Sequence, residues 1–227
     1  YLFAQQNIVS APVVDDFGRL IGAITVDDVL DVITEEAEED IMRLGGVQSD
    51  DLYSAAIATG RSRFSWLFVN LVTAIMASIV IGLFEATLEQ IVILAVLMPI
   101  VASMGGNAGT QTMTVAVRAL ATKELTATNA MRVMGKEVLV GLYNGVLFAL
   151  LIGAVAWFWT ETWTIGAIMA ASMLITLVIA ALSGMAIPLL LARTGVDPAV
   201  ASGVILTTVT DVVAFAVFLG LAALLLL

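Results

Sequence analysis

The sequence predicts an all-α membrane protein with five transmembrane helices, preceded by a partial α/β segment and an acidic helix. Hydrophobic residues make up 61% of the 227 residues and charged residues only 12%, whereas a soluble globular domain carries about 25% charged residues. Long uncharged stretches recur after residue 60, and acidic residues crowd the part before it. Together these observations set the fold class.

Five stretches contain no charged residue apart from a single aspartate, and each exceeds the roughly 18 apolar residues that indicate a spanning helix. They cover residues 64–84, 90–117, 138–160, 162–192 and 198–227. The second and fourth are longer than a bilayer requires. We expect Pro99 and the glycine pair at Gly105 to break the second, and Pro188 to break the fourth. Gly141 and Gly145 are spaced as a helix-packing face of the third.

Basic residues occur only before the first of these stretches and in every second loop after it. Arg61 and Arg63 precede the first, and Arg193 lies in the fourth loop, whereas the first and third loops and the C-terminal end hold no Lys or Arg. The second loop is flanked by Arg118, Lys123, Arg132 and Lys136. The positive-inside rule therefore predicts a multi-pass protein of the cell membrane, with a cytoplasmic N-terminal segment and the C-terminus outside. Glu137, beside Lys136, is expected at the cytoplasmic interface, with its side chain reaching toward water.

The N-terminal segment has the pattern of two short strands followed by a helix. Residues 12–18 end in an Asp/Gly turn, and a second apolar run follows it. Thr25 and Asp28 then form the pattern of a helix cap. We expect the helix to run from residue 26 to about Leu44, where a glycine pair stops it. The first residue is Tyr1 rather than Met, so we expect the chain to be part of a longer protein.

The excess negative charge lies entirely in residues 1–60, which hold twelve acids and two bases, while the remainder is neutral. Eight of these acids lie within fourteen residues: Asp27, Asp28, Asp31, Glu35, Glu36, Glu38, Glu39 and Asp40. On a helix, like charges at i,i+4 destabilise by a few tenths of a kcal/mol per pair. A solvated acidic face is the ordinary explanation of such a run. Because this one precedes a membrane domain, we favour a segment that senses divalent cations, which would relieve the repulsion.

The chain contains neither cysteine nor histidine. This composition excludes thiolate and imidazole metal sites and removes the commonest general base. Any metal site must be built from oxygen atoms, which suit Mg²⁺, Ca²⁺ or Mn²⁺.

Asp211 is the one charged residue inside a predicted span, near the middle of the fifth. Burying a carboxylate there costs about 2.5–3.5 kcal/mol even on the insertion scale, so it faces a cavity, is protonated or holds a cation. Thr207 and Thr210 offer hydroxyl oxygens nearby. In the second span, the amides of Asn107 and Gln111 need polar partners from another helix or an aqueous cavity. These residues are the candidates for a cation pathway and its supporting groups.

Three other functions compete with a channel as explanations of the membrane carboxylate, and the sequence argues against the second of them. The first is a secondary transporter in which Asp211 alternates between a proton and a cation, and the sequence does not separate it from a channel. An intramembrane aspartyl protease requires two membrane aspartates, and the sequence offers one. A structural membrane partner that binds nothing predicts that Asp211→Asn stabilises the protein without loss of activity.

The chain resembles the MgtE family of magnesium channels at several motifs. The most specific are Gly105-Gly-Asn-Ala-Gly-Thr-Gln111, Arg118-Ala-Leu-Ala121, Gly195-Val-Asp-Pro-Ala199 and the intramembrane Asp211. The resemblance covers essentially the whole chain. It divides the sequence into the C-terminal part of a CBS domain (1–32), an acidic plug helix with its linker (33–60) and a five-helix pore domain (61–227).

The resemblance implies a homodimer that is not an enzyme, with a pore on its two-fold axis where Asp211 of both subunits binds hydrated Mg²⁺. It also implies a regulatory role for the acidic positions at which cytoplasmic Mg²⁺ holds the channel shut, namely Asp28, Asp31, Glu36, Glu39 and Asp40. Mn²⁺, Co²⁺ and Ca²⁺ are further candidate ions. The lipid bilayer is an expected partner and nucleic acid is not.

Three details of the resemblance bear on selectivity and regulation. Thr25-Val-Asp-Asp28 is similar to the pattern with which CBS domains hold adenine nucleotides, a function that requires the rest of that domain. Ala214 stands where the family often has glycine, and residues 202–205 lack the Asn or Pro often found there. The choice among divalent cations therefore stays open at this point.

Overall fold

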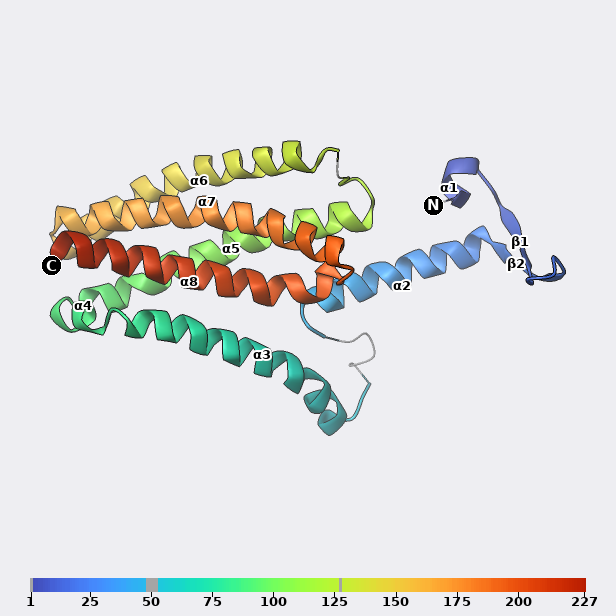
Figure 1. Ribbon diagram of the computed structural model, residues 1–227, viewed down its shortest axis with the longest axis horizontal. Coiled ribbons are helices and arrows are strands. Elements are labelled where there is room, and N and C mark those ends of the chain that lie inside the picture. Colours follow the sequence, from blue (N-terminus) through green and yellow to red (C-terminus); the bar gives the residue numbers. More distant parts are fainter. Residues whose placement is uncertain (1, 48–52, 127) are drawn as a thin grey trace. The chain divides into compact units, whose positions relative to one another are not determined.

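The structure is a computed structural model, and it describes residues 2–47, 53–126 and 128–227 (Figure 1). The chain forms two compact units, residues 1–63 and residues 64–227. Each unit is described by itself below.

The first unit contains a short helix, a two-stranded antiparallel sheet and a long helix. These elements are α1 (Leu2–Gln6), β1 (Ser10–Val14), β2 (Leu20–Thr25) and α2 (Val26–Leu44). Asp15 makes the turn between the strands, because its side chain accepts hydrogen bonds from the backbone N–H groups of Phe17 and Arg19 at 3.0 and 2.8 Å. Gly18 completes the turn with a φ of +78°, which favours glycine. The predicted strand pair and its turn are confirmed.

Helix α2 begins and ends at the predicted residues. A capping box of Thr25 and Asp28 fixes its start. At its end, the backbone N–H of Gly45 donates to the carbonyl of Met42 at 3.0 Å, and Gly46 follows with a φ of +68°. The glycine pair therefore stops the helix at Leu44.

The second unit is built from long apolar helices. They are α3 (Ala56–Gly82), which starts in the first unit, α5 (Ile93–Ala121), α6 (Ala130–Thr160), α7 (Trp163–Thr194) and α8 (Pro198–Leu226), with a short α4 (Glu85–Gln90) between the first two. Within the described residues, five helices are long and apolar enough to cross a membrane. Each corresponds to one predicted stretch, so the fold class is confirmed. The sequence did not predict α4.

The two long spans are continuous helices, contrary to the predicted breaks. Pro99 lies inside α5 and Pro188 inside α7, and neither interrupts its helix. In a membrane helix, neighbouring helices and local adjustments satisfy the carbonyls that a proline leaves free. Both helices also continue past their uncharged stretches, α5 to Ala121 and α7 to Thr194.

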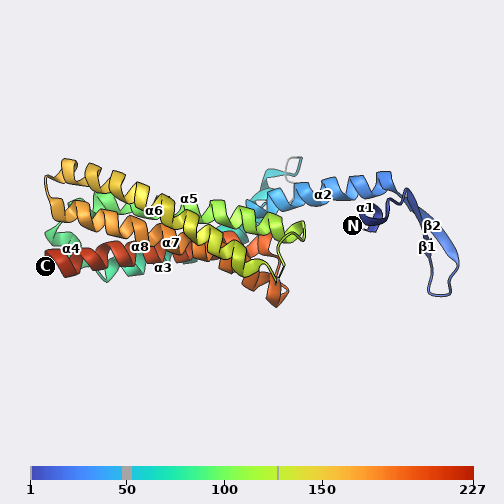
Figure 2. The same cartoon turned by 90° about the horizontal axis from the view of Figure 1, so that it is seen from above.

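Helix α7 lies at the centre of the bundle. Figures 1 and 2 show α5, α6 and α8 packed around it. Its interior side chains include Ile168, Met169, Met173 and Leu177, all fully buried, and Phe218 of α8 joins the same cluster. Helix α3 is the least buried of the spans. The core of the second unit therefore surrounds α7.

Glycines bring the helix backbones of this bundle close together. A Cβ atom added at Gly141 of α6 would lie 2.6 Å from the Cβ of Ala181 of α7. One turn further, Gly145 is also buried against α7, which confirms the predicted packing face. On the other side of α7, a Cβ at Gly184 would lie 2.6 Å from the carbonyl oxygen of Gly109 in α5. Small residues thus set the spacing of three helices.

Candidate cation site

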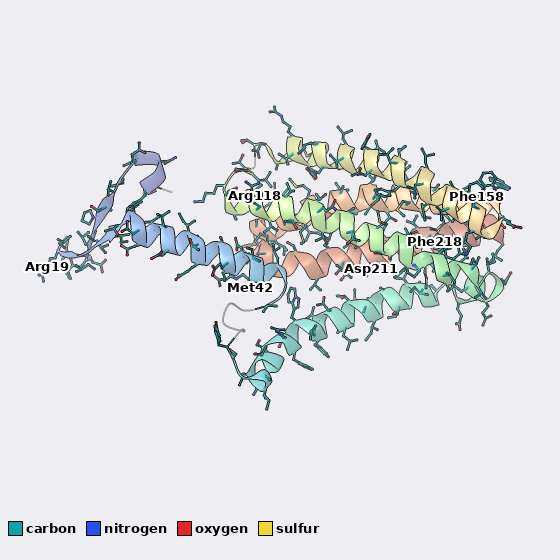
Figure 3. All side chains as sticks on the ribbon, turned by 180° about the vertical axis from the view of Figure 1, so that it is seen from behind. Arg19, Met42, Arg118, Phe158, Asp211 and Phe218 are labelled. Carbon is teal, nitrogen blue, oxygen red and sulfur yellow. The ribbon has the colours of Figure 1, made fainter. Side chains whose placement is uncertain are left out.

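Asp211 lies about halfway along α8, with Phe218 nearer the C-terminal end of the helix (Figure 3). Its side chain is partly exposed. Among the described residues, no hydrogen bond or ion pair reaches its carboxylate. Because an unpaired carboxylate inside a bilayer is costly, it is either protonated or met by water, a cation or another chain.

The two threonines proposed as supporting groups lie on different sides of α8. Thr207 precedes Asp211 by one helical turn, so it lies on the same face, and it is exposed. Its hydroxyl donates to the carbonyl of Gly203 at 3.1 Å. Thr210 is 1% exposed and packs toward Gly105 of α5. Thr207 is therefore the better placed of the two to act beside Asp211.

The amides of α5 lie on the face of that helix opposite its glycines. Gly105 and Gly109 are buried and contact α7 and α8, whereas Asn107 and Gln111 are exposed. Neither amide has a hydrogen-bond partner within the described part of the chain. At membrane depth, such groups require a partner helix or water. The described residues therefore leave these two amides without partners, so this face of α5 meets water or another helix.

The acids of α2 point largely to solvent. Asp31 and Glu36 are exposed, Asp40 is partly exposed, and Glu39 forms an ion pair with Arg43 one turn later. Over residues 2–47, 53–126 and 128–227, no three acidic side chains gather closely enough to hold a metal ion. A cation bound at these acids would take its remaining ligands from water or from another chain.

Asp28 is engaged in the cap of α2. Its Oδ2 atom accepts hydrogen bonds from the backbone N–H and from the hydroxyl of Thr25, both at 2.8 Å. These bonds, the backbone one foremost, hold the pKa of Asp28 below its usual value because they stabilise the charged form. Helix capping thus accounts for the Thr-x-x-Asp pattern.

Glu137 does not reach toward water as expected, and that prediction is wrong. Its side chain is only 9% exposed. The hydroxyl of Thr112 in α5 lies 3.4 Å from Oε2, and the Nζ atom of Lys136 lies 3.5 Å from Oε1. Because α6 extends beyond the uncharged stretch and packs against α5 and α7, the carboxylate is enclosed by helices.

Comparison with protein-family models places these residues in a known group. The model of MgtE, described as a divalent cation transporter, matches residues 98–221, which is more than half of the chain and includes Asp211. The chain belongs to the MgtE family. A model of the CBS domain also matches, over residues 1–35, which contain the strand pair and the first half of α2. The family resemblance seen in the sequence is confirmed.

Three curated members of this family match nearly the whole chain. The magnesium transporter MgtE of Thermus thermophilus is 40% identical over 229 residues, which cover 99% of this chain and 50% of that protein. The Bacillus subtilis protein of the same name is 33% identical, with 97% and 49% covered, and the Enterococcus faecalis one is 34% identical, with 96% and 48% covered. The chain spans about half the length of the curated relatives it matches.

Proposed function

We propose that this chain forms the membrane pathway of a divalent cation transporter, with Mg²⁺ as its cargo and Asp211 as the residue that binds the ion. The observation that carries this proposal is the position of Asp211, which is partly exposed halfway along a spanning helix and unpaired within the described residues. A divalent cation with its water offers the missing countercharge. The name of the three relatives, magnesium transporter, supports the choice of ion.

In this proposal, the pathway lies between two copies of the chain. Two Asp211 carboxylates near a two-fold axis repel each other in a partly dehydrated pore, and a divalent cation removes that repulsion. The exposed side-chain amides of Asn107 and Gln111 support a second subunit, because one subunit leaves them without partners among the described residues.

Mg²⁺ gives up its water reluctantly, so the carboxylates hold it through retained water molecules, with Thr207 close enough on the same face to bind those waters. Such binding is weak enough for the ion to leave again. Conduction requires this balance between entry and exit.

The second part of the proposal is that cytoplasmic Mg²⁺ regulates this pathway through α2. Asp31, Glu36, Glu39 and Asp40 supply only oxygen atoms and are at least partly exposed, which fits a hard divalent cation. The bound ion would stabilise one arrangement of the first unit, and its effect cannot exceed its difference in affinity between the open and closed states. This part requires the N-terminal unit to be cytoplasmic, which the basic residues of the second and fourth loops support.

The central experiment measures Mg²⁺ flux into liposomes that contain the purified protein. Asp211→Asn keeps the size of the side chain and removes its charge, so flux and ion affinity fall while the protein stays folded. Asp197→Asn is the matched control on the same helix. Asp197 caps α8 by accepting from the N–H of Ala199 at 2.9 Å, and Asn caps a helix equally well. Wild-type flux in folded Asp211→Asn would refute the proposal.

The same liposomes separate a channel from a proton-coupled transporter. A channel passes a current that follows the membrane voltage, whereas the flux of an exchanger depends on an imposed pH gradient. We expect the first behaviour, and a flux that requires the pH gradient would favour the second.

The regulatory part has its own test. Replacing Glu36, Glu39 and Asp40 together by their amides should relieve the inhibition of flux by millimolar Mg²⁺ on the cytoplasmic side. If inhibition is unchanged in this triple variant, the acids of α2 are not the sensor.

A further inference from the structure

Glu137 is a buried acid that the proposed pathway does not use. It lies on α6, one turn before Gly141, which packs closely on Ala181 of α7. Its partner Thr112 belongs to α5 and contacts Gly184 of α7, since a Cβ atom at Gly184 would lie 3.0 Å from the Cβ of Thr112. The carboxylate therefore lies at a junction of three helices.

The carboxylate is poorly satisfied at this junction. Its 3.4 Å contact with the Thr112 hydroxyl exceeds the usual 2.5–3.0 Å of an O–H···O bond. Its cationic neighbour, Lys136, is 72% exposed on the same helix, and a pair with an exposed lysine contributes little. The α7 residues that pack on α6 near this position are apolar: Ala181 lies against Gly141, and Met185 belongs to an apolar cluster with Val133 and Met134. Stability alone would favour an apolar residue here, because a buried acid without good partners is costly.

The partner of Glu137 connects it to the helix that carries the polar face. Thr112 lies in α5 one residue after Gln111, on the buried side. The same buried side of α5 meets α8 at Gly109, where a Cβ would lie 3.1 Å from Leu206. Rotation or sliding of α5 would therefore move both its amides and its contact with the helix of Asp211.

We propose that Glu137 is a positioning residue for cation transport, which holds α5 through Thr112 and so fixes the polar face of α5 beside the pathway. This inference rests on the proposed function. The long hydrogen bond to Thr112 rather than the charge does the positioning, because it joins two helices, whereas Lys136 is exposed and lies on the same helix as Glu137. Glutamine at position 137 preserves an acceptor for Thr112, and leucine removes it at similar size.

Flux measurements with four variants and one control variant test the role. We expect Glu137→Leu and Thr112→Val each to lower the maximal Mg²⁺ flux by about tenfold, the lower range for removing a supporting interaction. The half-saturating Mg²⁺ concentration should stay unchanged, because Asp211 is intact. Glu137→Gln should retain flux, and Glu137→Leu combined with Thr112→Val should be no worse than either alone. Lys136→Met is the control and should behave as wild type.

A second readout does not depend on transport. Since the chain has no cysteine, Asn107→Cys gives a single thiol on the polar face of α5, whose labelling rate by a water-soluble reagent reports the position of that face. The rate should change several-fold in the Glu137→Leu or Thr112→Val background and stay unchanged with Lys136→Met.

The outcomes separate the two proposals. Labelling that responds to these substitutions in a protein without Mg²⁺ flux would refute the transport function and keep the positioning role. Unchanged labelling, additive losses of flux or a loss of ion affinity in place of maximal flux would overturn the role of Glu137. Thr112→Val carries the test if the leucine variant fails to fold.

Discussion

Replacing Gly141 by alanine should destabilise the second unit far more than the same change at Gly135 in the same helix. An alanine Cβ at position 141 would lie 2.6 Å from the Cβ of Ala181 and 3.0 Å from the carbonyl oxygen of Leu177, whereas nothing lies within 4 Å at position 135. Ordinary contact begins at 3.4 Å. Helices α6 and α7 would therefore have to separate by about 0.8 Å (3.4 − 2.6), an overpacking of the kind that costs about 1–3 kcal/mol.

The comparison with Gly135 isolates this cost. Both changes gain the helix propensity of alanine over glycine, about 1 kcal/mol, and this gain cancels in the difference. At roughly 2–4 °C per kcal/mol for a domain of this size, Gly141→Ala should melt about 2–12 °C below Gly135→Ala. The assay is the loss of the monodisperse peak in size-exclusion chromatography after heating in detergent. Equal melting temperatures would refute a rigid close approach of α6 and α7.

Three further predictions follow from the two units. Thr207→Val should lower Mg²⁺ flux, whereas Thr210→Val should not, because the Thr210 hydroxyl donates within its own buried helix face; equal effects would contradict this. A cysteine at Asn107 should react with water-soluble thiol reagents and one at Leu151, an exposed apolar residue of α6, should not; equal reactivity would place both in the same surroundings. The folded-state pKa of Asp28 is depressed, so its stabilisation of α2 is present above its usual pKa of about 3.9 and is lost as pH falls through the lower folded value. The protection factors of the backbone amides at the start of α2 against hydrogen exchange, which allow for the intrinsic pH dependence of exchange, should fall over that range, and a flat protection profile would contradict the capping role.

The spans were predictable because long uncharged runs have few alternatives in a bilayer. The ends of the helices could not be predicted in the same way, because an uncharged run stops at the first charged residue while the helix continues. The predicted third span starts at residue 138, but α6 starts at Ala130 and carries Arg132, Lys136 and Glu137 on the extension. The apolar stretch marks the hydrocarbon, and the helix ends are set by capping and packing.

The burial of Glu137 could not be predicted from the sequence. Its neighbour Lys136 and its place at the edge of an apolar run are typical of an interface residue. Whether the carboxylate faces lipid headgroups or other helices depends on the rotation of α6, which Gly141 and Gly145 set by packing against α7. Asp211, by contrast, could be identified as a candidate site from the sequence, because a carboxylate in the middle of a span is costly however α8 is rotated.

The proline predictions failed for a related reason. In water, a proline inside a helix breaks or kinks it, because the residue lacks an N–H donor and its ring clashes with the carbonyl four residues earlier, and the freed carbonyls can bond to solvent. Inside a bundle, adjacent helices restrict that alternative, and both helices continue.

The glycine-lined contact between α6 and α7 also bears on the order of assembly during synthesis. These two helices are consecutive in the chain and share the most extensive helix interface of the unit. They can pair in the bilayer as soon as α7 has left the ribosome, because helix association there depends on close packing rather than on the rest of the fold. The helix that carries Asp211 is made after these two, and it meets a formed surface of α7 and α5. Nascent chains that end after Thr194 should therefore already hold α6 and α7 together.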